Sequence, residues 1–176
     1  RDTMILNHIE FAMMNNPVRA AIQRRIEAPK LFRMGGGMNG GRALEVGCGR
    51  GVGTELILEL FGAEHVDAFD LDPRMVERAR KRLSKYGSRV RVQVGDSNAI
   101  DAPDASYDAV FDFGIIHHIP DWRGALAEVH RVLKPGGRFY AEEVLRRFIV
   151  HPVTRRLLEH PLEDRFDAAD FADALE

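Results

Sequence analysis

Four glycines at alternate positions, 47, 49, 51 and 53, place the strongest constraint on this chain. They follow the mainly apolar residues 43–46 and precede a helical pattern at 54–61, which predicts a strand, a glycine loop and a helix in succession. Glycine lets the backbone pass close under a ligand, and N–H groups at the start of a helix favour an anionic or electron-rich group. A tight turn alone would need only one glycine. The spacing also differs from the G-x-G-x-x-G of dinucleotide-binding loops, so a diphosphate ligand is not the first expectation.

Short apolar runs alternate with helical patterns along the rest of the chain. We predict strands at residues 43–46, 65–69, 90–94, 109–113 and 138–144, and helices at 54–61, 72–87 and 121–133. Residues 134–137 form a predicted turn before the last strand. Strand–helix alternation with short connections predicts an α/β fold whose parallel sheet is covered on both faces.

Two amphipathic helices are expected before this sheet. The first has a stripe of Ile5, Leu6, Ile9, Ala12 and Met13; the second has Val18, Ala21, Ile22 and Ile26 and is expected to end at Pro29. A flexible glycine-rich stretch at 34–41 then marks the expected boundary. We therefore divide the chain into a helical lid, residues 1–34, and a main domain, residues 42–176.

Composition limits the class of protein. A chain of 176 residues with 45% hydrophobic and 30% charged residues is typical of one water-soluble domain. The net charge of -2 argues against a dedicated nucleic-acid binder, and no apolar run is long enough to insert stably into a membrane. One cysteine and scattered histidines predict no disulfide framework and no metal site, and favour the reducing cytoplasm. Because Arg1 comes first, we expect that an upstream segment is missing.

Acidic residues lie at or just after the ends of three of the predicted strands. Glu45 would place a carboxylate in the crevice of the glycine loop, where it suits a ligand with a positive charge or an amino group. Asp70 lies 21 residues after Gly49, about where an acid binds the two ribose hydroxyls of a nucleoside. Asp96 could accept a hydrogen bond from an exocyclic amine, such as that of adenine, or simply form a turn. Asp72 is better explained as the cap of the next helix.

Taken together, these segments resemble the class I S-adenosylmethionine-dependent methyltransferases of the small-molecule type. The resemblance covers residues 42–143 and depends on ALEVGCGRGVG, AFDLDPRMVERAR, VGDSNAI, DAVFDFGIIHHIPDW and EVHRVLKPGGRFYAEE. Each motif is modest alone, but the five in this order and spacing are specific. The resemblance implies a Rossmann-like, doubly wound, mostly parallel sheet. It also implies S-adenosyl-L-methionine as cofactor and S-adenosyl-L-homocysteine as product.

The resemblance also implies roles for individual residues. The methionyl part of the cofactor would be held by Glu45 and the loop of Gly47, Cys48 and Gly49. The ribose would bind Asp70, the adenine would pack on Leu71, and its edge would meet Asp96 and Ser97. Asp112 and Phe113, which end the fourth strand, would contact the amino acid end of the cofactor. We expect Cys48 to pack as a small hydrophobic residue without a redox role.

The chain departs from the family's outline at its C-terminal end. The family usually finishes with two more strands, the last of them antiparallel. Residues 166–176 are predicted to form the helix before that hairpin, and the sequence then stops. We therefore expect the closing hairpin to be missing and one edge of the sheet to lack its usual neighbour.

His117 and His118 follow the fourth predicted strand at the edge where open α/β sheets bind ligands. Either could be a general base toward the acceptor, or the pair could be structural; Glu142 or Glu143 could also face the acceptor. The methionines and phenylalanines of the lid favour a small, partly apolar acceptor. Two alternatives remain open: a domain that binds S-adenosylmethionine without transferring methyl groups, and a nicotinamide-dependent oxidoreductase. The oligomeric state and the identity of the acceptor are not predicted.

Overall fold

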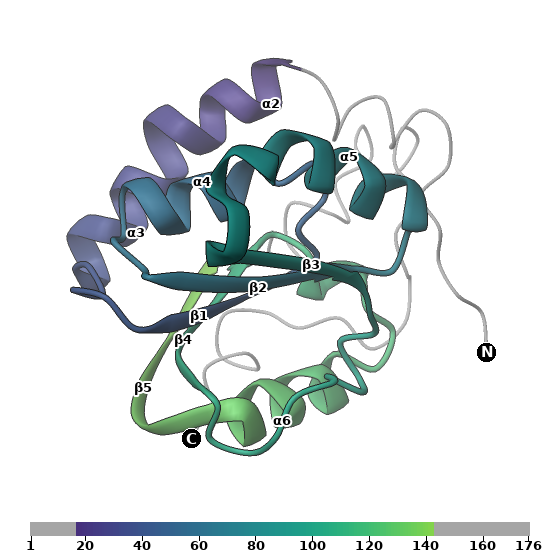
Figure 1. The fold of residues 1–176 in the computed structure, drawn as a ribbon. Helices are drawn as coiled ribbons and strands as arrows, with labels where there is room; N and C mark the ends of the chain where they lie inside the picture. The colour runs from purple at the N-terminus through teal and green to yellow at the C-terminus, as the bar shows by residue number, and fades with distance from the viewer. Residues whose placement is uncertain (1–16, 143–176) are drawn as a thin grey trace, which may run out of the picture.

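A computed structural model describes residues 17–142 of the chain (Figure 1). Five strands form one parallel sheet in the order β3-β2-β1-β4-β5. Their bounds are Arg42–Val46 for β1, His65–Asp70 for β2, Val90–Val94 for β3, Tyr107–Phe113 for β4 and Leu133–Glu142 for β5. The strands fall where the sequence predicts them, with ends that differ by a few residues, and the sheet confirms the predicted α/β class.

The two central strands, β1 and β4, are buried on both faces because helices cover both sides of the sheet. Ala43, Phe111 and Phe113 pack in the cluster under α3 and α4, whereas Leu44 and Val110 pack on the opposite face with α6. In the sheet, β2 and β3 lie on one side of β1, and β4 and β5 lie on the other. The loops after β1 and β4 therefore diverge, which opens a crevice at the carboxyl edge of the sheet.

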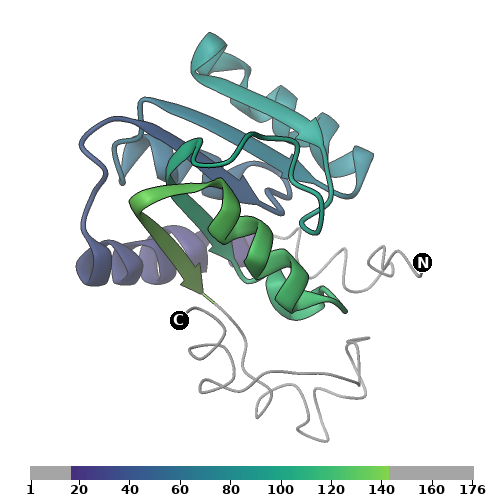
Figure 2. The same ribbon diagram turned by 90° about the horizontal axis from the view of Figure 1, so that it is seen from below.

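The helices divide between the two faces. α2 (Pro17–Ile22), the π-helical turn η1 (Gln23–Glu27), α3 (Ala28–Gly35), α4 (Val52–Glu59) and α5 (Pro73–Leu83) lie on one face. α6 (Trp122–Val132) covers the other face, as the view from below shows (Figure 2). Two 3-10 turns complete the described chain: η2 (Ser84–Arg89) after α5, and η3 (Ile116–His118) after β4. No helix in residues 17–142 is long and apolar enough to cross a membrane.

Pro29 does not end the N-terminal helical segment, contrary to the expectation from sequence. The helical conformation continues to Gly35 because the preceding turn, Gln23–Glu27, is π-helical. Within this wide turn the Ala28 N–H donates to the Gln23 carbonyl, five residues back. Pro29 then occupies a position in the first turn of α3, where its missing N–H is tolerated.

The glycine-rich stretch is hydrogen-bonded to the domain, and its first two residues, Met34 and Gly35, belong to α3, contrary to the expectation that no helix would include them. Arg138 donates from Nη1 to the Gly35 carbonyl at 2.8 Å, and the Tyr140 hydroxyl donates to the Gly36 carbonyl at 2.9 Å. The Met38 N–H donates to the Phe61 carbonyl at 2.7 Å. A Cβ atom at Gly35 would overlap the Tyr140 ring, so this glycine allows the close packing of the helix against β5.

The predicted turn at 134–137 lies inside β5 as an irregularity of the strand. β5 pairs with β4 first at Leu133 and again from Arg138 onward, with a register shift between these points. The predicted helices in residues 3–14 and 166–176, and the question of a closing hairpin, lie outside the described residues. Within residues 17–142, no strand pairs with the outer edge of β5.

Candidate functional site

A cavity of about 650 Å³ occupies the crevice at the carboxyl edge of the sheet. Its walls come from the loops that follow β1, β2, β3 and β4, together with one side of α2 and η1. This volume is in the range of small-molecule sites, about 300–1,000 Å³. Ten of the site residues predicted from sequence line the cavity: Glu45, Gly47, Cys48, Gly49, Asp70, Leu71, Asp96, Ser97, Phe113 and His118. Asp112, His117 and Glu142 do not line it, and Glu143 lies outside the described residues.

Two glycines of the loop after β1 permit close contacts that a side chain would prevent. Gly47 has a φ of +65°, and a Cβ atom there would overlap Ile115. Gly53 is helical, and a Cβ atom there would overlap both the Glu45 carboxylate and the Phe113 ring. The alternating glycines therefore bring the first turn of α4 directly against the ends of β1 and β4.

Glu45 is the most buried acid among the residues that line the cavity, with 2% of its surface exposed. Thr54, in the first turn of α4, donates its hydroxyl to this carboxylate. Burial raises the pKa of Glu45 to about 8, and the nearby Asp70 and Asp112 carboxylates contribute to the rise in pKa. A cationic group in the cavity would oppose this effect and favour the ionised carboxylate.

Asp70 joins the end of β2 to the glycine loop. Its Oδ2 accepts from the Gly49 N–H at 2.8 Å, and its Oδ1 accepts from the Asp72 N–H at 2.9 Å. Burial is the largest cause of the raised pKa of Asp70. Asp72 caps α5 through a hydrogen bond from the Arg74 N–H at 2.9 Å, which confirms the capping role that the sequence predicts for this residue.

The loop after β3 forms the next part of the wall. Asp96 accepts at Oδ1 from the Asn98 N–H at 2.9 Å, so it does form a turn. Asn98 in turn donates from Nδ2 to the carbonyl of Asp121, which caps α6. Asp96, Ser97 and Asn98 all line the cavity, so the turn and a binding role are compatible.

The end of β4 places its two predicted residues on opposite faces of the sheet. Phe113 faces α4 and lines the cavity. Asp112 is fully buried and accepts at Oδ1 from the Ile115 N–H at 2.8 Å. In this structure Asp112 thus shapes the loop between β4 and η3, while Phe113 forms the wall.

The two histidines lie together on η3, with ring centroids 4.1 Å apart. Only His118 lines the cavity, so it is the better placed of the two to meet an acceptor. Among the described residues, no group of histidine, cysteine and acidic side chains is arranged to hold a metal ion. Burial raises the pKa of the Cys48 thiol, which keeps it protonated and is consistent with an inert packing role.

Several lining residues were not among those predicted from sequence. Arg19, Ala20 and Gln23 line the cavity from α2 and η1. Their side of the helix could be found only after the helix was docked on the domain, since the sequence pattern fixes its apolar stripe but not its neighbours. Asn98, Ile115 and Asp121 are close in sequence to predicted site residues, and proximity to those motifs is the signal that would have found them.

A family model described as a methyltransferase domain matches residues 43–137, more than half of the chain. The chain belongs to this family. Its class is that of the S-adenosylmethionine-dependent methyltransferases of Rossmann-like fold, whose cofactor is S-adenosylmethionine and whose product is S-adenosylhomocysteine. The resemblance inferred from the sequence motifs is therefore confirmed.

Individual relatives support the same family. The chain is 34% identical over 118 residues to malonyl-[acyl-carrier protein] O-methyltransferase of Serratia marcescens, covering 67% of this chain and 44% of that protein. It is 35% identical over 103 residues to 27-O-demethylrifamycin SV methyltransferase of Amycolatopsis mediterranei, covering 56% of this chain and 37% of that protein. The methyltransferase chain thus spans less than half of the length of these curated relatives.

A solved structure is similar over a larger part of the fold. A Haloferax volcanii protein in complex with the methyltransferase activator Trm112 superposes with a TM-score of 0.77 at 21% identity, covering 98% of this chain and 76% of that chain. At this identity the likeness shows the fold alone.

Proposed function

We propose that this chain is the cofactor-binding part of an active methyltransferase that transfers a methyl group from S-adenosylmethionine to a small, partly apolar acceptor. The observation that carries the proposal is the acidic pole of the cavity. Two carboxyl groups, the buried one of Glu45 and the partly buried one of Asp70, line a cavity that also has apolar walls such as Phe113 and Ile115. This combination suits a cationic nucleoside.

The residues of the site fit the cofactor, and the fit depends on the close approaches at Gly47 and Gly53. Glu45 would attract the amino group and sulfonium of the methionyl part, and the ionised form of Glu45 would be favoured by that contact. Asp70 would accept hydrogen bonds from the ribose hydroxyls, since charge-assisted bonds of this kind are among the strong ones. Leu71, which is 41% exposed, would cover the adenine, and Asp96 and Ser97 would meet its edge.

When bound, S-adenosylmethionine supplies a methyl group on a sulfonium, open to in-line displacement by an acceptor. The chain contributes binding, orientation and the exclusion of water, which can provide most of the rate acceleration for such a transfer. His118 would hold a proton of the acceptor if the reaction needs a base; its place in the cavity wall supports this role over one for His117.

The acceptor would enter beside α2 and η1, the part of the wall that Arg19, Ala20 and Gln23 form. This supports the proposal that the N-terminal helices act as a lid over the site, with residues 42–176 forming the cofactor-binding domain. The relatives support a small acceptor, because their names specify a carrier-bound malonyl group and a rifamycin. A cytoplasmic location is part of the same proposal.

Two measurements on the full-length protein test the proposal. S-adenosylhomocysteine should raise the melting temperature, and at about 100 times its dissociation constant it would add roughly 2.7 kcal/mol of stability. A methyl-transfer screen across phenols, quinone precursors, amines, thiols and fatty acids should then find turnover. Binding without any turnover would favour the non-catalytic alternative, and stabilisation by a nicotinamide dinucleotide instead would favour an oxidoreductase.

A further inference from the structure

The N-terminal helical segment presents an outer face that nothing in the described structure covers. Its exposed residues are Pro17, Val18, Ile22, Arg25, Ile26, Lys30, Arg33 and Met34. Large apolar side chains on this face are strongly exposed: 66% for Val18, 60% for Ile26 and 75% for Met34. Exposed apolar side chains gathered along one helix in this way mark interaction surfaces.

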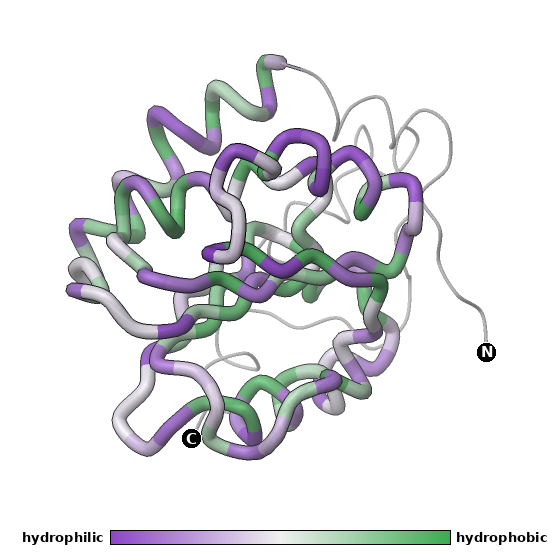
Figure 3. Tube along the Cα trace, in the orientation of Figure 1, coloured by the Kyte–Doolittle hydropathy of each residue, from purple (hydrophilic) through white to green (hydrophobic). Residues whose placement is uncertain are grey.

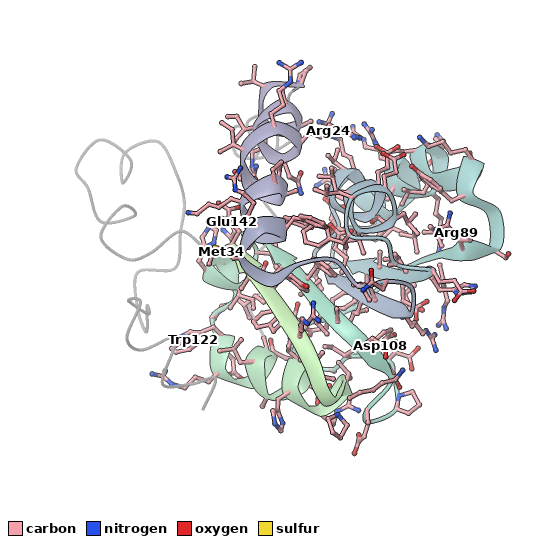
Figure 4. The ribbon with its side chains drawn as sticks, turned by 90° about the vertical axis from the view of Figure 1, so that its left-hand side faces the viewer. Arg24, Met34, Arg89, Asp108, Trp122 and Glu142 are labelled. Atoms are coloured by element: carbon pink, nitrogen blue, oxygen red, sulfur yellow. The ribbon has the colours of Figure 1, made fainter. Side chains whose placement is uncertain are left out.

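The outer face is distinct from the face that packs on the domain. Ala28 and Leu31 are buried in the cluster with Phe61 and Tyr140. Arg24, labelled in Figure 4, forms an ion pair with Glu55 of α4. The helix is thereby anchored by its inner side, and the exposed row 18, 22 and 26 follows the four-residue spacing of one helix face. Figure 3 shows hydrophobic positions recurring along this segment between hydrophilic ones.

The charges on the outer face all have one sign. Arg25, Lys30 and Arg33 are exposed there, and no acidic residue is. The one acid within residues 17–35 is Glu27, which is only partly exposed and forms an ion pair with Arg19. An apolar row with basic neighbours and without acids is complementary to an anionic surface that also offers an apolar layer.

The outer face lies on the same helical segment as part of the cavity wall. Arg19, Ala20 and Gln23, on the same helical segment, line the cavity. A surface bound by the outer face would therefore lie next to the entrance of the acceptor part of the site.

We propose that the outer face of residues 17–35 docks the protein on the surface of an anionic phospholipid membrane. Val18, Ile22, Ile26 and Met34 would enter the boundary between headgroups and acyl chains, and Arg25, Lys30 and Arg33 would contact anionic headgroups. The contact is peripheral, because no described helix can span the bilayer. This surface is separate from the cofactor pole, so the docking does not depend on the proposed reaction.

Charge also argues against a second copy of the chain as the occupant. In a symmetric dimer through this face, the same basic residues of both copies would meet, and like charges across an interface are unfavourable. An acidic carrier protein would pair with the basic residues of the outer face. The acyl-chain boundary of a membrane would in addition bury the projecting apolar row of Val18, Ile22 and Ile26.

The test is co-sedimentation of the full-length protein with phosphatidylglycerol-containing vesicles, using phosphatidylcholine vesicles for comparison. We expect binding to the anionic vesicles that weakens with salt. Ile26→Ser and Arg25→Glu should each weaken vesicle binding. The loss for Arg25→Glu should be roughly five- to tenfold, since each basic residue near an anionic membrane surface strengthens binding. Arg91→Glu reverses a charge that is 60% exposed on β3 and should leave binding unchanged.

The melting temperature and the affinity for S-adenosylhomocysteine are measured for every variant. Both should equal the wild-type values, and vesicle binding should change alone. The proposal is overturned if the wild type does not prefer anionic vesicles or if the three variants bind equally. It is also overturned if Ile26→Ser lowers the melting temperature, which would mean that another part of the protein covers this face. Dissociation of a dimer by Ile26→Ser, or binding of an acidic carrier protein in place of vesicles, would overturn it as well.

Discussion

Thr54 donates its hydroxyl to the carboxylate of Glu45, and this hydrogen bond joins the first turn of α4 to the end of β1. Both side chains are buried, with 0% and 2% of their surfaces exposed. The contact is possible because Gly53 leaves no side chain between α4 and the strand. The polar end of the candidate site is therefore built into the core of the fold.

The buried carboxyl group of Glu45 should make stability depend on pH. The pKa of Glu45 is about 8 in the folded protein and near 4.5 in the unfolded chain, so the unfolded state releases this proton first as pH rises. The Glu45 contribution to the free energy of unfolding should therefore decrease between about pH 4.5 and 8. Urea unfolding of Glu45→Gln should show a shallower decline than the wild type over this range. Parallel profiles for the two proteins would contradict the raised pKa.

Asp70 and Asp72 offer a matched pair of variants. Asp70→Asn removes the charge that we assign to the ribose hydroxyls and should weaken S-adenosylhomocysteine binding by about 1.5–3 kcal/mol, or roughly 10- to 150-fold. Asp72→Asn also removes a charge, but asparagine caps helices nearly as well as aspartate, so affinity should stay near the wild-type value. Calorimetric titration checks both. A larger loss of affinity for Asp72→Asn would reverse the two assignments.

Gly53→Ala should change the stability of the protein in the opposite direction from an ordinary glycine-to-alanine substitution in a helix. Replacing glycine by alanine inside a helix usually stabilises a protein by up to about 1 kcal/mol. At position 53 the added methyl would overlap Glu45 and Phe113, so we expect a lower melting temperature and weaker cofactor binding. An increase in melting temperature with unchanged affinity would show that the tight approach of α4 to β1 is not needed.

Gln23→Ala should separate the acceptor from the cofactor. Gln23 is 9% exposed and lines the cavity from the N-terminal segment, so its loss should raise KM for the acceptor while the affinity for S-adenosylhomocysteine changes little. Lys81→Ala, on the outer side of α5 with a side chain that is 77% exposed, is the control and should change neither quantity. Deleting residues 1–34 is a poorer test, because Ala28 and Leu31 belong to the core. Equal KM values for Gln23→Ala and Lys81→Ala would contradict a contact between the N-terminal segment and the acceptor.

The two histidines should differ in their effect on turnover. His118→Asn should lower kcat and alter its pH profile if His118 accepts a proton from the acceptor, whereas His117→Asn should leave the shape of that profile unchanged. The pH dependence of kcat is the measurement. The same profile for the wild type and His118→Asn would leave positioning as the only role of this residue.

Much of the fold follows from local sequence signals, since strand alternation, the glycine loop and the caps at Asp72 and Asp121 all depend on neighbouring residues. The course of the N-terminal segment does not follow from local signals. Continuation past Pro29 depends on a π-helical turn, and the position of the glycine stretch depends on hydrogen bonds from Arg138 and Tyr140, about a hundred residues away. The part of the cavity wall formed by Arg19 and Gln23 could not be predicted either, because tertiary docking decides which side of a helix faces a site.

The central claim is that Glu45 and Asp70 form one acidic pole for a cationic nucleoside cofactor. Calorimetric titration with S-adenosylhomocysteine at pH 7, in two buffers of different ionisation enthalpy, tests it most directly. The amino group of the ligand should favour ionised Glu45, so binding should release a proton from the wild type and none from Glu45→Gln. Saturable binding with this difference in proton release is the predicted result. Absence of binding to the folded wild type, or equal proton release from both proteins, would contradict the account.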